Sequence, residues 1–357
     1  MKKTIYPVLL TVPLLFCGCS LYSKFESEPI EYDAERICVI DSINEPLSYV
    51  SWREIFNDKY LAAWIDSGLK SNTDLQIARL NVEKAAATLT ASRLAFLPSA
   101  NLGVEGSAGY KSDNRFQIGP SATWEIDIFG KQRNLKLGAE ASFYASDAYR
   151  QAVQTSLIAT IAEGYYTLLM LDEQLTISER TIKTWDENIR VLQALKRAGR
   201  TNEAAVLQAR ANRMRVENSA LTLKSQIAEQ ENSIRSLLLD PEANMTRGKL
   251  SQQIFPDTLS SGITLELLSN RPDVRAAEFE LQKSFYDINV ARAAFYPSLT
   301  LSGNAGWATS SGVGIGNPSS WIANAIGSLT APLFNRGTNN ANLRGCLIMN
   351  VNIREPI

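Results

Sequence analysis

Side chains that could perform covalent or acid–base chemistry are sparse in this chain. It contains no histidine, which excludes a Ser-His-Asp triad, a zinc site with histidine ligands and a histidine general base. Three carboxylates, Glu105, Glu125 and Asp127, lie in or next to segments of alternating polarity, where they are better explained as groups facing water than as a catalytic pair. We therefore predict that the protein is not an enzyme and has no catalytic residue, cofactor or metal site.

One cysteine lies in a sequence context that predicts covalent modification. Lys2 and Lys3 precede an apolar stretch, residues 5–16, which is too short to span a bilayer as a helix and predicts a signal peptide. The stretch ends in Phe16-Cys17-Gly18-Cys19-Ser20, which resembles a bacterial lipobox with cleavage after Gly18 and lipid attached to Cys19. Because Phe16 stands where such boxes favour leucine, the alternative is an ordinary secretory signal with an unmodified Cys19. The cysteines are too few and too scattered for a disulfide framework: Cys17, Cys19, Cys38 and Cys346.

The N-terminal signal also predicts a location in the outer membrane. Acylation with more than one tail would anchor the chain stably, and Ser20 after the modified cysteine resembles lipoproteins sorted to the outer membrane. We therefore expect a signal peptide over residues 1–18 and a lipid-anchored extension over residues 19–51. No later run of about 20 apolar residues predicts a transmembrane helix. The balance of 36 basic and 37 acidic residues gives no basic footprint for nucleic acid.

Two segments of the chain share one pattern of small and apolar residues, with spacings that alternate between three and four. Each position of the second segment lies 199 residues after its counterpart, as Val274 follows Leu75 and Phe295 follows Phe96. Both segments end in a proline and a serine, at 98–99 and at 297–298. We infer a tandem duplication with a helix at the start of each copy. The two sets are Leu75, Ala78, Val82, Ala85, Leu89, Ser92 and Phe96, and Val274, Ala277, Leu281, Ser284, Ile288, Ala291 and Phe295.

After each of these helices the hydrophobic period changes from about 3.5 to 2, which predicts β-strands. Loops over 111–115 and 308–320, polar or rich in Gly and Ser, would join the strands in pairs. About ten residues with one apolar face match the strands of membrane barrels. The expected strands are 99–110, 116–127, 298–307 and 321–333. Aromatic residues suited to a membrane interface lie near the loops: Tyr110, Phe116, Trp307 and Trp321.

A soluble β-sandwich is the alternative to membrane strands, because its half-buried strands alternate in the same way. The predicted outer-membrane location favours the membrane interpretation. Four strands cannot close a barrel, and an open sheet edge is not tolerated in lipid. The chain must therefore oligomerise if these strands span the membrane, so that several copies share one β-barrel.

Long helices are predicted between the two strand pairs. Residues 131–198 contain no proline, and as one helix they would extend about 100 Å at about 1.5 Å per residue. After a turn at 199–202, a return helix runs from about 203 to 239, where Asp240-Pro241 stops it. Heptad spacing in both helices predicts an antiparallel coiled coil, with a soluble helical bundle as the alternative. The positions are Leu175, Ile182, Trp185, Ile189 and Leu192 on the first helix, and Val206, Ala209, Val216, Ala220, Leu223, Ile227, Ile234 and Leu237 on the second.

Several motifs in order resemble those of the outer-membrane channel lipoproteins of bacterial efflux pumps, the TolC/OprM/NodT family. Trp124-Glu125-Ile126-Asp127-Ile128-Phe129-Gly130-Lys131 resembles the family signature at the exit of the second strand, and residues 330–337 resemble its second version. Residues 271–274 and 292–298 are also typical of the family. The resemblance covers about residues 52–344. The motif residues at the strand–helix junctions are Asp127, Phe129, Gly130, Lys131, Pro332, Phe334 and Gly337.

This resemblance implies a homotrimer in which four strands per subunit form one barrel in the outer-membrane lipid. Long antiparallel coiled-coil helices would form a periplasmic α-barrel, so the expected fold class is mainly α with membrane β. The implied function is an exit duct for small molecules handed over by an inner-membrane transporter and a periplasmic adaptor (membrane fusion) protein. The tip Ala198-Gly199-Arg200-Thr201 would dock the adaptor. It keeps the family's glycine but not its apolar flanks, and Gly199 is equally well explained as a helix C-cap.

The second copy departs from the family near Arg344. We expect a first repeat over residues 52–270, an incomplete second repeat over 271–344 that opens with a helix at 272–296, and an aberrant tail over 345–357. The tail shows no helical heptad pattern, and only 23 residues follow Phe334, where the family continues into another long hairpin. A frameshift or a premature stop would explain this pattern. The family's aperture residues have no counterpart to which they could be assigned.

Two functions from different classes therefore compete. The first is an efflux channel subunit, and the second is a truncated, non-conducting fragment or structural outer-membrane lipoprotein. A periplasmic adaptor fits poorly, because adaptors resemble one helical hairpin inserted in lipoyl and barrel domains. Nothing in the sequence selects among drugs, metals, dyes and exported peptides as the transported substance.

Overall fold

The computed structural model describes residue 25 and residues 51–109, 112–253, 270–309 and 320–354. The chain divides into two compact units, each built from segments that are distant in sequence. The first unit comprises residues 1–32, 81–148 and 273–357, and the second comprises residues 33–80 and 149–272. Within the described ranges, no helix combines the length and the apolar composition that crossing a bilayer requires.

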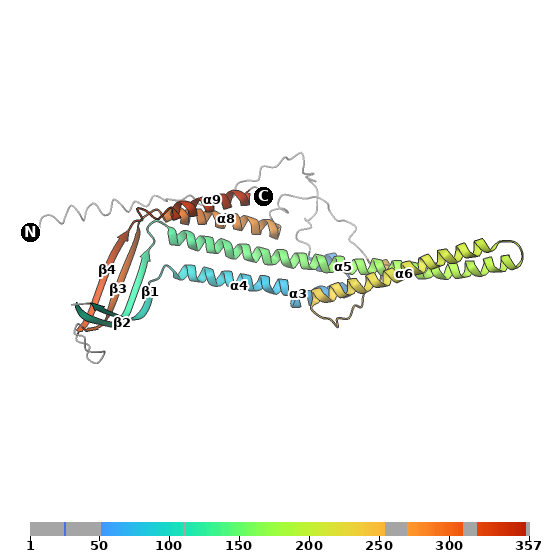
Figure 1. Ribbon diagram of the computed structural model, residues 1–357, viewed down its shortest axis with the longest axis horizontal. Coiled ribbons are helices and arrows are strands. Elements are labelled where there is room, and N and C mark those ends of the chain that lie inside the picture. The colour runs from blue at the N-terminus through green and yellow to red at the C-terminus, as the bar shows by residue number, and fades with distance from the viewer. Residues whose placement is uncertain (1–24, 26–50, 110–111, 254–269, 310–319, 355–357) are drawn as a thin grey trace, which may run out of the picture. The chain divides into compact units, whose positions relative to one another are not determined.

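The first unit contains an antiparallel sheet of four strands in the order β1-β2-β3-β4 (Figure 1). The strands are β1 (Ser99–Gly109), β2 (Ser112–Ile126), β3 (Ser298–Thr309) and β4 (Ser320–Thr330). Each lies where the change to a period of two predicted a strand. The central pairing runs from Phe116 opposite Thr309 to Ile126 opposite Leu299. The sheet therefore joins strand pairs that are far apart in sequence.

Two strand boundaries, the start of β2 and the end of β4, differ most from the sequence prediction. We expected a loop over 111–115, but β2 begins at Ser112, which pairs with Gly109. The polar residues of this segment do not end the strand, because strand pairing uses backbone groups. β4 ends at Thr330 rather than at 333, since Pro332 has no N–H to continue a ladder. The predicted loop 308–320 and the aromatic residue at 110 lie wholly or mostly outside the described residues.

Two glycines allow β2 and β3 to approach closely at one point. A Cβ atom on Gly119 would lie 2.0 Å from the carbonyl oxygen of Ala305, and a Cβ atom on Gly306 would lie 2.3 Å from that of Ile118. The pairing between β2 and β3 skips this point, where Pro120 also lacks an N–H. Residues without a side chain are thus needed at both positions for the strands to stay paired on either side.

The two helices that precede the strand pairs are α4 (Thr73–Leu94) and α8 (Pro272–Ala293). On each helix, most of the buried side chains belong to the set of small and apolar residues that repeats after 199 positions. The buried members are Leu75, Ala78 and Leu89 on α4, and Ser284, Ile288 and Ala291 on α8. We expected the second helix to continue to 296, but it ends at Ala293. Pro297 follows, and the residue before a proline is disfavoured in helical geometry.

The chain from Arg344 to Arg354 is helical, which shows that the prediction of a tail without helical pattern was wrong. α9 (Thr338–Arg354) follows β4 and lies beside α8 (Figure 1). Asn339 donates to the carbonyl oxygen of Ala294 (3.0 Å), and Asn350 donates to the hydroxyl of Ser284 (2.6 Å). Four of the described side chains of α9 are half-buried, at a helical spacing of four, three and four residues: Asn339, Leu343, Cys346 and Asn350. Two of the four are asparagines, so a search for apolar heptads did not detect the pattern.

The second unit is built from helices. They are α2 (Trp52–Ile55), α3 (Lys59–Ser71), α6 (Glu203–Leu238), the 3-10 helix η3 (Leu250–Gln252) and the larger part of α5 (Lys131–Arg197). As predicted, α5 is one continuous helix, and α6 returns beside it as the second arm of a hairpin (Figure 1). The predicted coiled-coil positions of both helices are buried or half-buried.

Tyr165 lies at the centre of the core of the second unit. Its side chain is fully buried, and the ring of Trp64 meets it edge-on at 5.0 Å between centroids. Aliphatic residues from α3, α5 and α6 pack around this pair: Leu61, Ile65, Ile161, Leu168, Ile234 and Leu238. This packing of an aromatic pair against aliphatic side chains joins the three helices.

Candidate functional site

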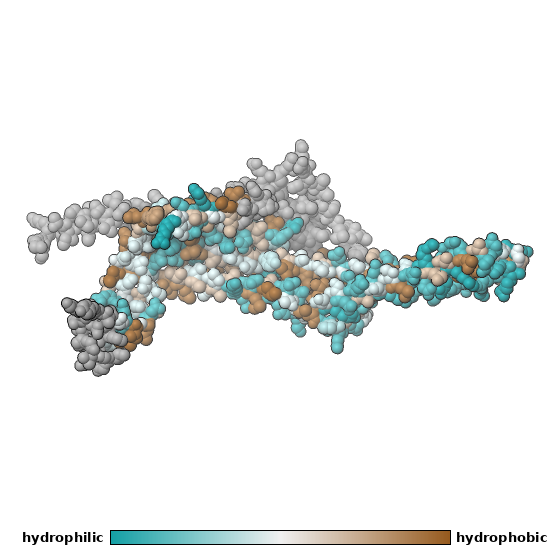
Figure 2. All heavy atoms as spheres, viewed as in Figure 1, coloured by the Kyte–Doolittle hydropathy of each residue, from teal (hydrophilic) through white to brown (hydrophobic). Residues whose placement is uncertain are grey.

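The two faces of the four-stranded sheet differ in polarity. Large apolar side chains project from one face into the surroundings, with Leu102 79% and Val104 63% exposed. The register places further exposed apolar residues on the same face: Ile118, Trp124, Leu301, Trp307 and Leu329. Figure 2 shows hydrophobic residues over the strands, in contrast to the mostly hydrophilic end of the α5–α6 hairpin. A continuous exposed apolar face marks a surface that meets lipid or another protein.

The opposite face of the sheet carries hydrogen-bonding side chains at one level. Its members face one another across all four strands and are Asn101, Ser121, Asn304 and Asn324. Glu105 and Glu125 lie on the same face, the first opposite Gln117 and the second opposite Thr300. The register therefore separates these two carboxylates rather than pairing them.

The first strand–helix junction is built by residues of the family motif. The Asp127 carboxylate accepts hydrogen bonds from the backbone N–H groups of Gln132 (3.0 Å) and Arg133 (2.8 Å). These two donors at the start of α5 have no partner within the helix, so the carboxylate satisfies them and also favours the helix dipole. Gly130 has a φ of 74°, a left-handed conformation that favours glycine. Asp127 and Gly130 thus set the turn from β2 into α5.

Both versions of the motif meet at one open cavity of about 370 Å³, whose lining includes Asp127, Phe129, Lys131 and Pro332. Phe129 stacks on Tyr296, with 5.1 Å between the ring centroids. Lys131 forms an ion pair with Glu125 at 3.5 Å. The cavity walls thus include a stacked aromatic pair and a partly exposed charge pair, an arrangement that positions chain segments.

At the second junction, Gly337 precedes α9 as Gly130 precedes α5. Its φ is 78°, and its carbonyl oxygen accepts from the N–H of Ala341 (2.9 Å). Phe334 is 86% exposed, so this motif residue does not pack within the described part of the first unit. The exposed ring is available to another surface.

The predicted docking tip ends α5 with a local cap. Gly199 has a φ of 70°, its N–H bonds to the carbonyl of Lys196, and the N–H of Arg200 bonds to that of Leu195. This pair of bonds is a Schellman motif, which requires a left-handed residue where Gly199 stands. The C-cap interpretation of Gly199 is therefore confirmed, and docking by Ala198, Gly199, Arg200 and Thr201 stays a prediction.

Helix α6 starts with its own cap close to this tip. The Asn202 side chain accepts from the N–H of Ala205 (3.1 Å). Glu203 pairs with Lys196 across the turn, and hydrogen bonding to that ammonium holds the pKa of Glu203 below its ordinary value. The turn is thus shaped by local bonds, and its own side chains remain available to a partner.

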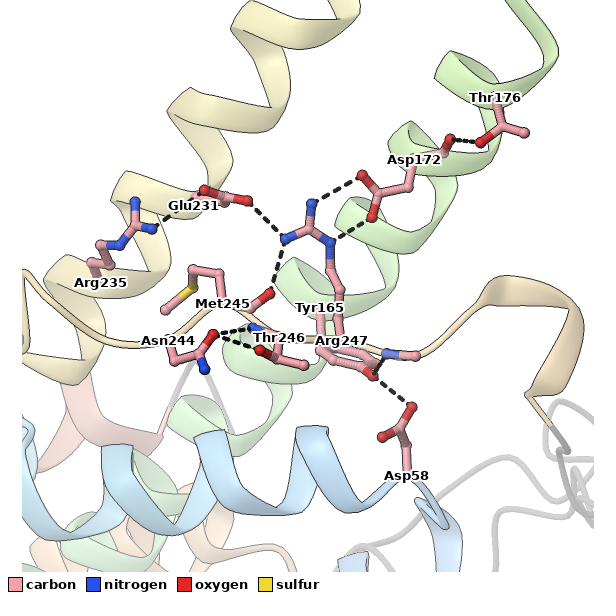
Figure 3. A network of polar contacts seen from close by, with 11 residues as sticks. Asp58, Tyr165, Asp172, Thr176, Glu231, Arg235, Asn244, Met245, Thr246 and Arg247 are labelled. Carbon is pink, nitrogen blue, oxygen red and sulfur yellow. Dashed lines mark hydrogen bonds and ion pairs between the residues drawn. The ribbon is translucent and has the colours of Figure 1, made fainter. Parts of the chain in front are cut away.

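A network of polar contacts fastens the segment after α6, residues 239–253, which we call the strap (Figure 3). Arg247 of the strap donates to both carboxylate oxygens of Asp172 on α5, at 2.5 and 2.9 Å. It also donates to Glu231 on α6 at 2.7 Å and to the carbonyl oxygen of Met245 at 3.1 Å. The hydrogen bond with Asp172 is the main cause that raises the pKa of Arg247 above its ordinary range, so the guanidinium stays charged.

A second group of contacts joins the strap to α3 and α5. The hydroxyl of Tyr165 donates to Asp58 (2.5 Å) and accepts from the N–H of Gly248 (3.0 Å). Asp58 caps α3 by accepting from the N–H of Tyr60 (2.8 Å), and it also accepts from the side chain of Gln253 (2.8 Å). Partial burial raises the pKa of Asp58, but these hydrogen bonds outweigh burial and hold the pKa below its ordinary value. Burial is the main cause that raises the pKa of Tyr165, so its hydroxyl keeps its proton.

Sequence reasoning missed this network, although one signal was present. Asp58 precedes a helix, where aspartate favours the N-cap position. Nothing local connects Asp58 to Tyr165 or to Arg247: Asp58 and Tyr165 lie 107 positions apart, Tyr165 and Gly248 lie 83 apart, and Asp172 and Arg247 lie 75 apart. Of the residues that sequence reasoning did select, Cys19 lies outside the described residues.

Comparison with known proteins gives the chain its family. A family model described as outer membrane efflux protein matches residues 64–238 and 264–348. The chain is 27% identical to the "Probable outer membrane lipoprotein SilC" of Salmonella typhimurium over 356 residues. This alignment covers 94% of this chain and 76% of that protein. The chain is 26% identical to the cation efflux system protein CusC of Escherichia coli K12 over 351 residues, 93% of this chain and 75% of that protein.

Solved structures agree with these relatives. The open state of the Neisseria gonorrhoeae MtrE outer membrane channel matches with a TM-score of 0.80 and 27% identity, covering 93% of this chain and 76% of that one. A structure of CusC matches with a TM-score of 0.78 and 26% identity, covering 91% of this chain and 77% of that one. The fold and these matches define a mainly helical transport protein of the outer membrane.

The chain belongs to the outer membrane efflux protein family, which confirms the resemblance seen in its motifs. It is an outer-membrane component of efflux. The chain spans about three quarters of the length of SilC and CusC, 76% and 75% respectively.

Proposed function

We propose that this chain is the channel subunit of a tripartite efflux system, a passive exit duct for small molecules. An inner-membrane transporter would deliver them through a periplasmic adaptor protein, and three copies of the chain would form the channel. The observation that carries the proposal is the four-stranded sheet with one exposed apolar face. Within the described strands, β1 and β4 each pair with a single neighbour, so both edges of the sheet are open.

An open sheet edge in lipid leaves backbone donors and acceptors without partners, and each unpaired group costs roughly several kcal/mol. Pairing β1 of one copy with β4 of the next satisfies both edges. Closure then places the apolar face towards lipid and the row with Asn101 and Asn304 towards the water-filled interior. The same argument favours a closed membrane barrel over a soluble sandwich, whose apolar face would need a second sheet.

The two halves of the chain support the inference of a tandem duplication. Each half has the order helix, strand, strand, helix, as α4-β1-β2-α5 and as α8-β3-β4-α9. A glycine with positive φ precedes the last helix of each set, Gly130 in one and Gly337 in the other. Matching turns at matching places favour descent of both halves from one ancestral unit.

Two further features would place the channel between its partners. Acylation of Cys19 after removal of a signal peptide would anchor the chain to the outer membrane. The α5–α6 hairpin would form part of a periplasmic helical wall, with Ala198-Gly199-Arg200-Thr201 contacting the adaptor. The Schellman cap supports this placement, because it holds the turn in one shape, and residues 198–200 are exposed.

The transported substance is proposed only as a class. The names of two relatives refer to cations and to solvents, while this chain offers a polar strand face with amide, hydroxyl and carboxylate groups. Such a face suits hydrated small molecules in transit rather than one tightly held ligand. The family is one of transport proteins, and we infer that this member performs no chemical reaction on what it carries.

Oligomerisation and conductance of the purified chain test the proposal. Electrophoresis without boiling should give a trimer that boiling converts to a monomer, and planar bilayers should show discrete conductance steps. Gly119→Ala should abolish both, because its Cβ would lie 2.0 Å from a backbone oxygen, whereas Gly103→Ala has open space and should abolish neither. A monomeric, rapidly degraded wild-type chain without conductance would contradict the proposal and favour the non-conducting alternative.

A further inference from the structure

We propose that the dipeptide Arg247–Gly248 is a two-point clasp that fastens the strap to α3, α5 and α6, and that both points open and close together. The first point is the Arg247 side chain, and the second is the backbone N–H of Gly248. The inference goes beyond the channel function, because it concerns what holds the helices of the second unit to one another.

The first point joins the two arms of the helical hairpin. The Arg247 guanidinium reaches Asp172 on α5 and Glu231 on α6, and its side chain is only 13% exposed. Removing it would take from the Asp172 carboxylate its two hydrogen bonds to the guanidinium and would leave Glu231 with Arg235, its other cation. The strap therefore supplies a bond between α5 and α6 that neither helix makes alone.

The second point joins the strap to the start of α3. The N–H of Gly248 donates to the buried hydroxyl of Tyr165, which donates to Asp58. Gln253, at the far end of the strap, donates to the same carboxylate. One carboxylate at the N-terminus of α3 is therefore bonded to α5 and to the strap at once.

Close approach at this point requires a glycine. A Cβ atom on residue 248 would lie 2.8 Å from Asp58 Oδ2, 3.3 Å from Gln253 Nε2 and 3.5 Å from the Tyr165 hydroxyl oxygen. Any side chain there would push the carboxylate away from Tyr165. The absence of a side chain at 248 is thus part of the clasp.

An open cavity of about 260 Å³ beside the clasp, lined by Asp58, Lys59 and Gln253 among others, could suggest a ligand site instead. The partners of Asp58 argue against a cation there, because each of them is a donor: the Tyr165 hydroxyl, the Gln253 amide and the N–H of Tyr60. The Asp58 carboxylate is therefore already bonded to donors that cap α3 and hold the strap.

The two points are adjacent in the chain, and this adjacency is the reason to expect joint opening. Releasing Arg247 gives the next peptide group freedom to leave Tyr165, and releasing Gly248 does the same for Arg247. When one of the two points is bonded, its neighbour in the chain is already held in place and loses less conformational entropy on forming its own bond. An open clasp would free the start of α3 from α5 and remove one bond between α5 and α6.

Hydrogen–deuterium exchange on the full chain in detergent tests the clasp. For each variant, exchange is measured at the point of the clasp that the substitution does not contact. Arg247→Met should speed exchange of the Tyr60 and Leu61 amides at the start of α3 by about tenfold. Tyr165→Phe should speed exchange across Ala243–Arg247 by a similar factor, since a lost hydrogen bond that leaves a buried donor unpaired has an effect of about this size. Tryptic cleavage after Lys249 should accelerate in both variants.

Matched controls separate the clasp from general loosening. Tyr149→Phe removes an exposed hydroxyl from the same helix, and Arg213→Met removes an arginine that binds two carboxylates nearer the hairpin turn. Neither should alter exchange in the strap. Gln253→Ala is a milder variant that should shift both readouts in the same direction by a smaller factor. The proposal is overturned if Arg247→Met leaves Tyr60 and Leu61 unchanged, or if Tyr165→Phe affects only its own contacts.

Discussion

Both ends of the α5–α6 hairpin bind an arginine between two carboxylates, but the surroundings of the two arginines differ. Near the strap, Arg247 lies among partly buried groups and also bonds to a backbone carbonyl. Nearer the turn, Arg213 pairs with Asp186 and Glu217, whose side chains are 54% and 48% exposed. The two sites have the same charges and nearly the same distances.

Burial, rather than the number of ion pairs, therefore decides how strongly each end of the hairpin is held. Exposed pairs are screened by water and salt, and their long side chains lose entropy when they bind. Near the strap, the ion pairs adjoin a hydrogen-bonded tyrosine within the aromatic and aliphatic core. We therefore expect the strap end to resist opening and the turn end to respond to a partner.

The largest effect should come from the buried ring of Tyr165, next to the strap. Tyr165→Ala removes a fully buried side chain and should lower the free energy of unfolding by about 3–5 kcal/mol. Tyr149→Ala, which truncates a tyrosine that is 57% exposed on the same helix, should change it by less than about 0.5 kcal/mol. Urea denaturation of both variants measures the contrast, and equal losses would refute the central role of Tyr165.

The next effect concerns the space at Gly248. Gly248→Ala should cost about 1–3 kcal/mol, because the added methyl group collides with the Asp58 carboxylate. Gly345→Ala, in α9 where a Cβ atom meets nothing within 4 Å, should instead stabilise by about 0.5–1 kcal/mol, since alanine favours a helix. Thermal melts of the two variants should shift in opposite directions. Equal shifts would mean that the close approach at Gly248 does not matter.

The contribution of Asp58 to the stability of the strap end should depend on pH. The folded pKa of Asp58 lies below the unfolded value of 3.8, so its contribution to stability is present above about pH 3.8 and is lost as pH falls through the lowered value. The difference in unfolding free energy between wild type and Asp58→Asn should therefore be constant near neutral pH and shrink below about pH 4. Denaturation curves at several acid pH values measure it. A difference that grows on acidification would contradict the assigned direction of the pKa shift.

The smallest effect is expected at the turn end. Arg213→Met should barely move the melting temperature, and the small change should shrink further in about 0.5 M salt, because water and added ions weaken exposed ion pairs. Arg247→Met should keep its larger effect under the same conditions. Differential scanning calorimetry at low and high salt measures both variants. An identical salt dependence of the two melting temperatures would show that burial does not distinguish Arg247 from Arg213.

Much of the fold followed from local pattern. The stripe with Leu75 and Ala78 predicted α4, the change of period after Ser99 predicted the strands, and Asp240-Pro241 marked the end of α6. The junction motif also predicted where Asp127 and Gly130 act, since a capping carboxylate and a left-handed glycine are local requirements. These features could be predicted because each depends on neighbours within about one or two turns of helix.

Other features depended on contacts that no local pattern contains. The polar face of α9 went unrecognised because Asn339 and Asn350 bind partners on and near α8 that only folding brings close. The start of β2 at Ser112 depends on pairing with β1 rather than on polarity.

The sequence by itself determined the family and most of the helices and strands, apart from the C-terminal part of α9 and the start of β2, because periodicity, prolines, glycines and caps act over short distances. Only the tertiary structure decided that Asp58, Tyr165 and Arg247 share one network, and that Gly119 and Gly306 face each other across two strands. Such choices rest on burial and on bonds between distant segments. Their energy exists only after the chain has closed the loops between them.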